Sequence, residues 1–293
     1  MKKNIVLSSI FLLSILVAVV LTIYIVDSSD TPSSFNTHIV QSKVLNEERE
    51  IIVRTPRGYS SDSSENYPVI YVFGGNSLTF SISNDLDLLI RTGHSKRALV
   101  VGVPNISQET RQRDLTPPFL KQDLDEKDSP QGQADFYLNF VETEVIPLIE
   151  KNYRTSSERV AVGHSREGLM VMYSIMVKPK LFNGHLALSP ALWREENHFV
   201  DVFRAFIQES DTIPSKVFLT MGELEVDKMK NAFDLTADIL KASSEKANYR
   251  SLYFSKANHG TNPYLTSSIG LDWILNKAND SEQLEKMSTV NPN

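Results

Sequence analysis

Short apolar runs that alternate with amphipathic segments constrain the fold of this chain more than any other feature. The strand-like runs are YPVIYVFGG, RALVVGV, RVAVG, GHLALS, KVFLTMG and YRSLYFS, between residues 67 and 255. Segments with helical spacing lie among them, at 84–92, 133–153, 166–177, 197–208 and 229–246. Apolar strands joined through helices are typical of parallel sheets buried on both faces. The sequence therefore predicts an α/β fold with a mostly parallel central sheet and helices on both faces.

The limits of this domain follow from the same patterns. Residues 37–45 and 49–56 indicate an opening strand pair, and residues 262–278 indicate a closing helix. Pro147 predicts a kink within the helix expected at 133–153. We expect one α/β domain over residues 37–278, followed by a flexible tail over 279–293.

The N-terminal segment indicates a membrane location. Residues 5–26 carry no charged side chain, and a helix of this length spans about 33 Å, enough for a hydrocarbon core of about 30 Å. The absence of an A-x-A pattern favours a retained anchor, with a cleaved signal peptide as the alternative. Two lysines before the run and two aspartates after it favour an exported domain. We expect an anchor or signal segment over 1–27, a linker over 28–36 and a periplasmic or extracellular domain, secreted if the segment is cleaved.

Composition excludes several functional classes. The formal net charge of -6 and the lack of a Lys/Arg run argue against nucleic-acid binding. The chain has 0 cysteines, which excludes disulfides and thiolate catalysis. Its 6 histidines form no H-E-x-x-H pattern, so we expect no metal and no cofactor.

A turn after one predicted strand carries a candidate nucleophile. In GHSREG, Ser165 follows the strand RVAVG and precedes a predicted helix, a strand–turn–helix setting that exposes a serine hydroxyl. Such a serine needs a histidine to take its proton and a carboxylate to orient that histidine. GELEVD offers Glu223, Glu225 and Asp227 after one strand, and KANHG offers His259 after the next. Each element alone is common in loops, but their order predicts a hydrolytic site.

These residues carry a family resemblance. From about residue 37 to residue 278 the chain resembles the putative-esterase family of α/β-hydrolases, which includes enterobactin-type siderophore esterases, S-formylglutathione hydrolases and mycobacterial mycolyltransferases. The matching stretches are YPVIYVFGGNSLTF, RQRDLTP, ADFYLNFVETEVIPLIEKNYRTSSERVAVGHS, LFNGHLALSPALW, GELE and NHG.

The resemblance implies roles for individual residues. Ser165 is expected as the nucleophile, His259 as the base and Glu225 as the acid. The implied oxyanion hole consists of backbone N–H groups at Gly75 or Asn76 and at Arg166, and Trp193 is expected to line the substrate cleft. Arg113, in RQRDLTP, is expected either to shape the cleft or to form a surface salt bridge.

One position departs from the family pattern, whose elbows read G-H-S-x-G-G. Here Glu167 replaces the first of the paired glycines. A glutamate there must either point outward or displace the helix, which would weaken the oxyanion hole. There are two alternative interpretations of these residues. Arg166 and Glu167 are both solvated in the first helical turn, or they pair with each other.

The function expected from the sequence is cleavage of carboxylic esters through an acyl-enzyme. Siderophore-type esters are favoured, because four arginines are available to meet an anionic ligand: Arg111, Arg113, Arg166 and Arg194. Acyl transfer to a sugar or lipid alcohol and a catalytically inactive binding protein of the same fold are the alternatives. The sequence does not define an oligomeric state.

Overall fold

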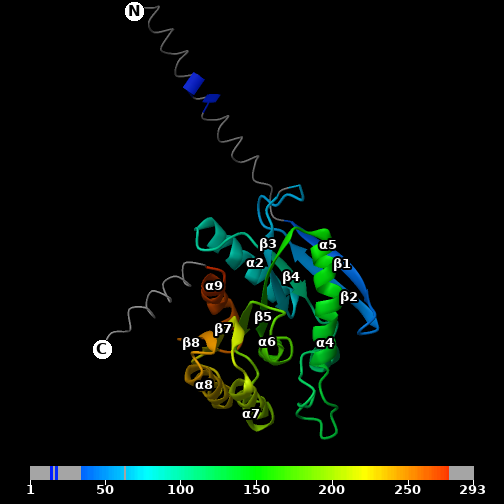
Figure 1. The fold of residues 1–293 in the computed structure, drawn as a ribbon, viewed down its shortest axis with the longest axis vertical. Coiled ribbons are helices and arrows are strands. Elements are labelled where there is room, and N and C mark those ends of the chain that lie inside the picture. Colours follow the sequence, from blue (N-terminus) through cyan, green and yellow to red (C-terminus); the bar gives the residue numbers. More distant parts are fainter. Residues whose placement is uncertain (1–13, 16, 19–33, 63, 277–293) are drawn as a thin grey trace, which may run out of the picture.

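The computed structural model describes residues 14–15, 17–18, 34–62 and 64–276 (Figure 1). The expected anchor or signal segment, the linker and the tail lie wholly or largely outside these residues. Among the described residues, no helix has the length and apolar character needed to cross a membrane.

Eight strands form one sheet in the order β1-β2-β4-β3-β5-β6-β7-β8. Their bounds are β1 Phe35–Ser42, β2 Glu47–Arg54, β3 Tyr67–Phe73, β4 Leu99–Val103, β5 Thr155–His164, β6 Gly184–Leu188, β7 Ile213–Gly222 and β8 Ala247–Phe254. Strand β2 is antiparallel to both of its neighbours, and all other neighbouring strands are parallel. The predicted α/β class with a mostly parallel sheet is confirmed.

Helices cover both faces of the sheet (Figure 1). Helices α2 (Asn76–Arg91) and α9 (Asn262–Leu275) pack on one face, where they share a core with alternate residues of the central strands. The other face is covered by α4 Ala134–Phe140, the π-helical turn η1 Val141–Val145, α5 Ile146–Asn152, α6 Arg166–Val177, α7 Arg194–Glu209 and α8 Asp227–Ala242. A short helix, α3 (Gln108–Asp114), lies between β4 and α4.

Strand β5 shows how the sheet separates the two cores. Val160 and Val162 point into the core beneath α2 and α9, whereas Ala161 points into the core beneath α6. All three are fully buried, because side chains alternate between faces and both faces are covered. The carboxyl end of β5 is therefore fixed from both sides.

The helix expected at 133–153 contains a π-helical turn beside its proline. Pro147 lies in the first turn of α5, and the π-helical turn η1 separates α5 from α4. Proline has no N–H to donate to the preceding turn, so a local widening of the helix accommodates it.

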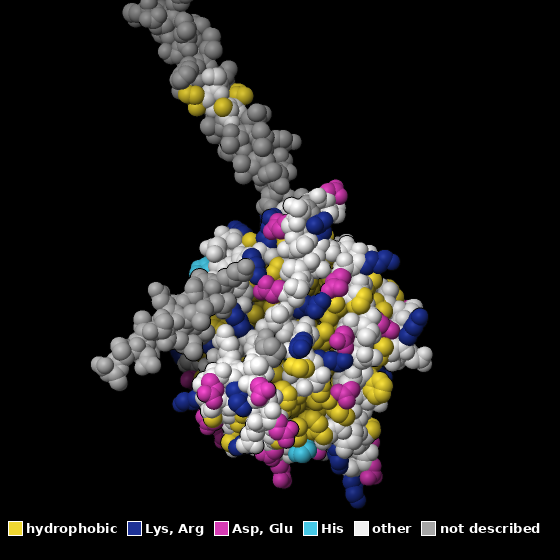
Figure 2. Space-filling model, in the orientation of Figure 1, with side chains coloured by type: hydrophobic (Ala, Val, Ile, Leu, Met, Phe, Trp, Pro, Cys, Tyr) yellow, Lys and Arg dark blue, Asp and Glu magenta, His cyan; other side chains and the backbone are white. Residues whose placement is uncertain are grey.

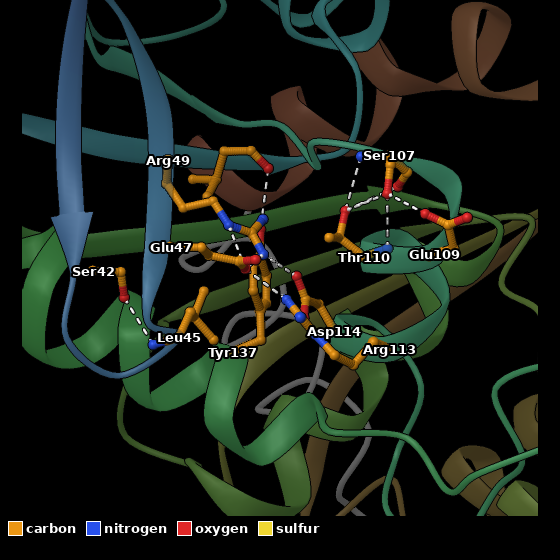
Figure 3. A network of polar contacts seen from close by, with 11 residues as sticks. Ser42, Leu45, Glu47, Arg49, Ser107, Glu109, Thr110, Arg113, Asp114 and Tyr137 are labelled. Atoms are coloured by element: carbon orange, nitrogen blue, oxygen red, sulfur yellow. Dashed lines mark hydrogen bonds and ion pairs between the residues drawn. The ribbon is translucent and has the colours of Figure 1, made fainter.

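Charged side chains form a buried network between β2 and α3 (Figure 3). The Arg49 guanidinium forms an ion pair with Asp114, and these side chains are only 0% and 1% exposed. Arg113 donates to Asp114 Oδ1 at 2.7 Å and to Glu47 Oε1 at 2.6 Å. Arg49 also donates to Glu47 Oε1, at 2.5 Å. The network attaches the segment after β4 to the antiparallel edge of the sheet.

On the face shown in Figure 2, basic and acidic side chains are interspersed over the surface. Charges of opposite sign that lie side by side weaken each other's field, and salt screens what remains beyond a Debye length of about 8 Å. This face therefore presents no extended field of a single sign.

Candidate active site

Ser165 stands at the tight turn between β5 and α6. Its backbone has φ 59° and ψ -115°, a left-handed conformation that is unfavourable for a serine and common at functional turns. The turn needs Gly163, because a Cβ there would lie 2.5 Å from the carbonyl carbon of Glu167. Close approach of strand and helix thus places the hydroxyl at the carboxyl edge of the sheet, as the elbow motif predicts.

The structure brings the predicted serine, histidine and acid together. His259 Nε2 lies 3.0 Å from Ser165 Oγ, and His259 Nδ1 lies 2.8 Å from Glu225 Oε2. Since a carboxylate only accepts, Nδ1–H donates to Glu225, and Nε2 is left to accept the serine proton. This geometry allows general-base activation of the hydroxyl.

The structure distinguishes the three acids of the GELEVD loop. Glu225 is buried, whereas Glu223 is exposed and the Asp227 side chain is 99% exposed beside Lys230. Burial alone would raise the pKa of Glu225, but hydrogen bonds from His259, Ser189 and the Gly222 N–H outweigh it and hold this pKa below its usual value. Of the three acids, Glu225 is the one that contacts His259 as a buried carboxylate.

Three further residues, which sequence reasoning missed, form a chain of hydrogen bonds that holds Glu225 in place. Ser189 Oγ donates to Glu225 Oε1 at 2.5 Å, and Asn262 Nδ2 donates to Ser189 Oγ at 2.8 Å. Asn262 also donates to Thr220 Oγ1 at 2.9 Å, and all three supporting side chains are buried. Ser189 is the last residue of the predicted strand GHLALS, and Thr220 lies near the end of the predicted strand KVFLTMG. A polar residue at the carboxyl end of an apolar strand could therefore have indicated a place in the site.

His164 supports the histidine loop from the residue before the nucleophile. Its Nε2–H donates to the carbonyl oxygen of His259 at 2.9 Å, and the two imidazole rings are 4.5 Å apart. Burial, together with the nearby His259, lowers the pKa of His164 to about 4. His164 is therefore neutral at physiological pH and adds no positive charge that would oppose protonation of His259.

The predicted oxyanion donors lie at the first turns of two helices. Asn76 begins α2 and Arg166 begins α6, so neither N–H has a carbonyl acceptor four residues back within its own helix. Gly74, with φ +123°, turns the chain from β3 toward α2, and Gly75 caps that helix. Helix N-termini favour negative charge, which suits a developing oxyanion.

The two predicted substrate residues lie in different surroundings. Trp193 is partly exposed, follows a loop whose Ala191 N–H donates to the Ser165 carbonyl at 2.9 Å, and has Lys228 Nζ 3.6 Å from its ring centroid. The Arg113 guanidinium is bound by Glu47 and Asp114 in the network beneath α3. Trp193 thus lies on a loop attached to the elbow, whereas the contacts of Arg113 are structural.

Both side chains of the RE pair bind other parts of the protein, and they do not pair with each other. Arg166 donates to Thr116 Oγ1 at 2.7 Å and to the Gln122 carbonyl at 2.8 Å. Glu167 is buried and receives two hydrogen bonds from Arg111, each of 2.6 Å. Arg111 lies 56 residues from Glu167 in sequence, so the local sequence pattern did not predict this ion pair.

Within the described part of the chain, no group of three or more His, Asp and Glu side chains is arranged to hold a metal ion. The polar groups around Ser165 instead form the hydrogen-bonded relay described above.

Comparison with known proteins identifies several relatives. The chain is 27% identical over 179 residues to the ferri-bacillibactin esterase BesA of Bacillus subtilis, covering 54% of this chain and 60% of that protein. It is 30% identical over 169 residues to a siderophore enterobactin esterase of Emericella nidulans, covering 51% of this chain and 54% of that protein. The matches thus span little more than half the length of these relatives.

Solved structures share the fold over a longer stretch. An IroE-like serine hydrolase from Shewanella oneidensis superposes with a TM-score of 0.76 at 24% identity, covering 83% of this chain and 80% of that one. A BES protein from Bacillus cereus gives a TM-score of 0.71 at 24% identity, covering 82% and 96%. The model of the family described as "Putative esterase" matches residues 42–263, which include the elbow, the acid loop and His259. The chain therefore belongs to the putative esterase family.

Proposed function

We propose that the protein is a serine hydrolase that cleaves carboxylic esters through an acyl-enzyme. The observation that carries this proposal is the relay in which His259 lies 3.0 Å from Ser165 Oγ and 2.8 Å from Glu225. Membership of the esterase family supports the same reaction class.

The proposed reaction has two halves. In the first, Ser165 Oγ attacks the ester carbonyl while His259 Nε2 takes the hydroxyl proton, and the negative oxygen is stabilised by N–H groups at Asn76 and Arg166. Protonated His259 then gives that proton to the departing alcohol. In the second half, His259 removes a proton from water, and the resulting hydroxide attacks the acyl carbon. The bond from that carbon to Ser165 Oγ then breaks, His259 returns the proton to Oγ, and the acid leaves. Glu225 stabilises the imidazolium in both halves.

Buried arginines beside the elbow support an anionic substrate, such as a siderophore-type ester, although Glu167, Asp123 and Glu195 lie among them. Burial and the nearby cations Arg194 and Arg111 lower the pKa of Arg166 to about 10. Arg194 is also buried and donates to the Lys121 carbonyl at 2.6 Å. An anionic group here would offset the repulsion among these cations. The relatives named as siderophore esterases support the same substrate class.

A fluorophosphonate probe tests the reaction type, because it modifies only a serine that is activated as a nucleophile. We expect one covalent adduct on Ser165, located by mass spectrometry of the digested protein, and none in Ser165→Ala. A wild-type protein that remains unlabelled would instead support the inactive binding protein of the same fold.

We also propose that residues 5–26 anchor an exported domain in the membrane, on the basis of their uncharged sequence and the flanking charges. We expect the protein to keep its N-terminus and to stay in the membrane fraction after a high-salt wash. Recovery of a soluble form that begins near Asp27 would favour a cleaved signal peptide.

A further inference from the structure

The unusual residue of the elbow lies in a buried ion pair. The Glu167 side chain is 7% exposed and the Arg111 side chain is 28% exposed. Arg111 Nε donates to Glu167 Oε1 and its Nη2 donates to Oε2, so both carboxylate oxygens are held in a bidentate arrangement. The pair joins the first turn of α6 to α3.

The same side chain lies beside the turn that leads into α2. A Cβ at Gly74 would lie 3.3 Å from Glu167 Cγ and 3.6 Å from its Oε1. Gly74 directly precedes Gly75, the N-cap of α2, and has the backbone φ of +123° that starts the turn. Glu167 therefore fills the space beside Gly74, the first residue of the segment Gly74–Asn76, here called the oxyanion loop.

We propose that Arg111 and Glu167 are positioning residues that hold the oxyanion loop at the correct distance from Ser165. The inference rests on the proposed esterase reaction, since it assigns the pair to that site. The pair links segments that follow three adjacent strands, β3, β4 and β5, at their carboxyl ends. A shift of one of these segments by about 1 Å would misplace an oxyanion donor, which can lower a rate by about 10²-fold.

Charge makes Arg111 the more important partner. A carboxylate beside the oxyanion loop repels the negative charge that develops on the substrate oxygen, unless a cation neutralises it. Arg111 neutralises Glu167 and fixes its orientation through two parallel hydrogen bonds. A lysine would keep the charge but not the two-bond geometry.

Single variants of Arg111 separate the effect of its two-bond geometry from the effect of its positive charge. We expect Arg111→Met to lower kcat on a small activated ester by about 10-fold to 100-fold, with KM changed by less than about threefold. Affinity for a boronic acid, which forms a tetrahedral anionic adduct with the serine, should fall in parallel with kcat. Arg111→Lys should recover only part of the loss. Arg111→Met within twofold of wild type, or Arg111→Lys equal to wild type, would overturn the proposal.

A double variant tests the role of the unpaired carboxylate. Arg111→Met combined with Glu167→Gln should be at least threefold faster than Arg111→Met alone, because the repelling charge is removed. A double variant no faster than the single one contradicts the charge argument. The matched control is Arg159→Met, which breaks the surface pair with Glu150 at the amino end of β5 and should leave kcat unchanged.

Amide hydrogen exchange tests the positioning role without depending on turnover. We expect residues 74–79 to exchange faster in full-length Arg111→Met than in wild type, while Arg159→Met exchanges there as wild type does. Unchanged exchange at 74–79 would overturn the inference. If the wild type is inactive and is not labelled by the fluorophosphonate, while residues 74–79 still exchange faster in Arg111→Met, only the esterase proposal is contradicted. The positioning role of Arg111 would then stand.

Discussion

Glu225→Gln is expected to lower kcat by about 10²-fold to 10⁴-fold while the protein stays folded. The amide keeps the size of the side chain, but it cannot balance the imidazolium charge on His259, and its NH₂ group can orient the ring in the wrong tautomer. The lowered pKa of Glu225, held down by three hydrogen bonds, means that the carboxylate is the form present at neutral pH. Steady-state kinetics on an activated ester, with circular dichroism as the folding check, measure the effect.

The loop supplies its own matched controls. Glu223 and Asp227 are exposed and lie two residues on either side of Glu225. Glu223→Gln and Asp227→Asn should therefore stay within about threefold of wild type, since screening weakens exposed charges. A deeper loss at either control than at Glu225 would mean that another carboxylate orients His259.

Asp114→Asn is expected to lower the free energy of unfolding by about 3 to 5 kcal/mol. Asparagine has nearly the same shape, but it leaves the fully buried Arg49 guanidinium with Glu47 as its one remaining carboxylate (Figure 3). Removing Asp114 leaves Arg49 and Arg113 to share the Glu47 carboxylate, so a buried positive charge is only partly compensated out of water. Urea denaturation followed by tryptophan fluorescence measures the loss.

Glu150→Gln is the control for this prediction, because Glu150 pairs with Arg159 at the surface. It should change the free energy of unfolding by less than about 1 kcal/mol. A loss below about 1 kcal/mol in Asp114→Asn as well would show that water or Glu47 compensates Arg49, and that the network adds little stability.

The sheet and the relay could be predicted because their signals are local. Each buried strand is a short apolar run, and each candidate side chain follows directly after such a run. Parallel strands bring their carboxyl ends to one edge, so the order of the runs along the chain was enough to expect Ser165, Glu225 and His259 as neighbours.

Long-range pairing accounts for most of what the sequence did not predict. The partners Arg49 and Asp114 are 65 residues apart in sequence, and charged residues are usually exposed, so a local pattern does not indicate burial. Residues Glu195, Glu196 and Asn197 have positive φ angles in the first part of α7, which begins at Arg194, before the helix predicted at 197–208. Glu195 Oε1 accepts from the Lys121 N–H at 2.5 Å, a tertiary contact that local propensity cannot anticipate.

The direction of β1 has a consequence for how substrates arrive. Strand β1 is parallel to β4, because both are antiparallel to β2, so Phe35 lies at the end of the sheet opposite to Ser165. A strand of eight residues spans about 26 Å, so the chain enters this strand on the side of the sheet away from the nucleophile. In the proposed anchored form, the nucleophile would lie on the side of the domain away from the point of attachment, which would favour freely diffusing esters over alcohols embedded in a bilayer.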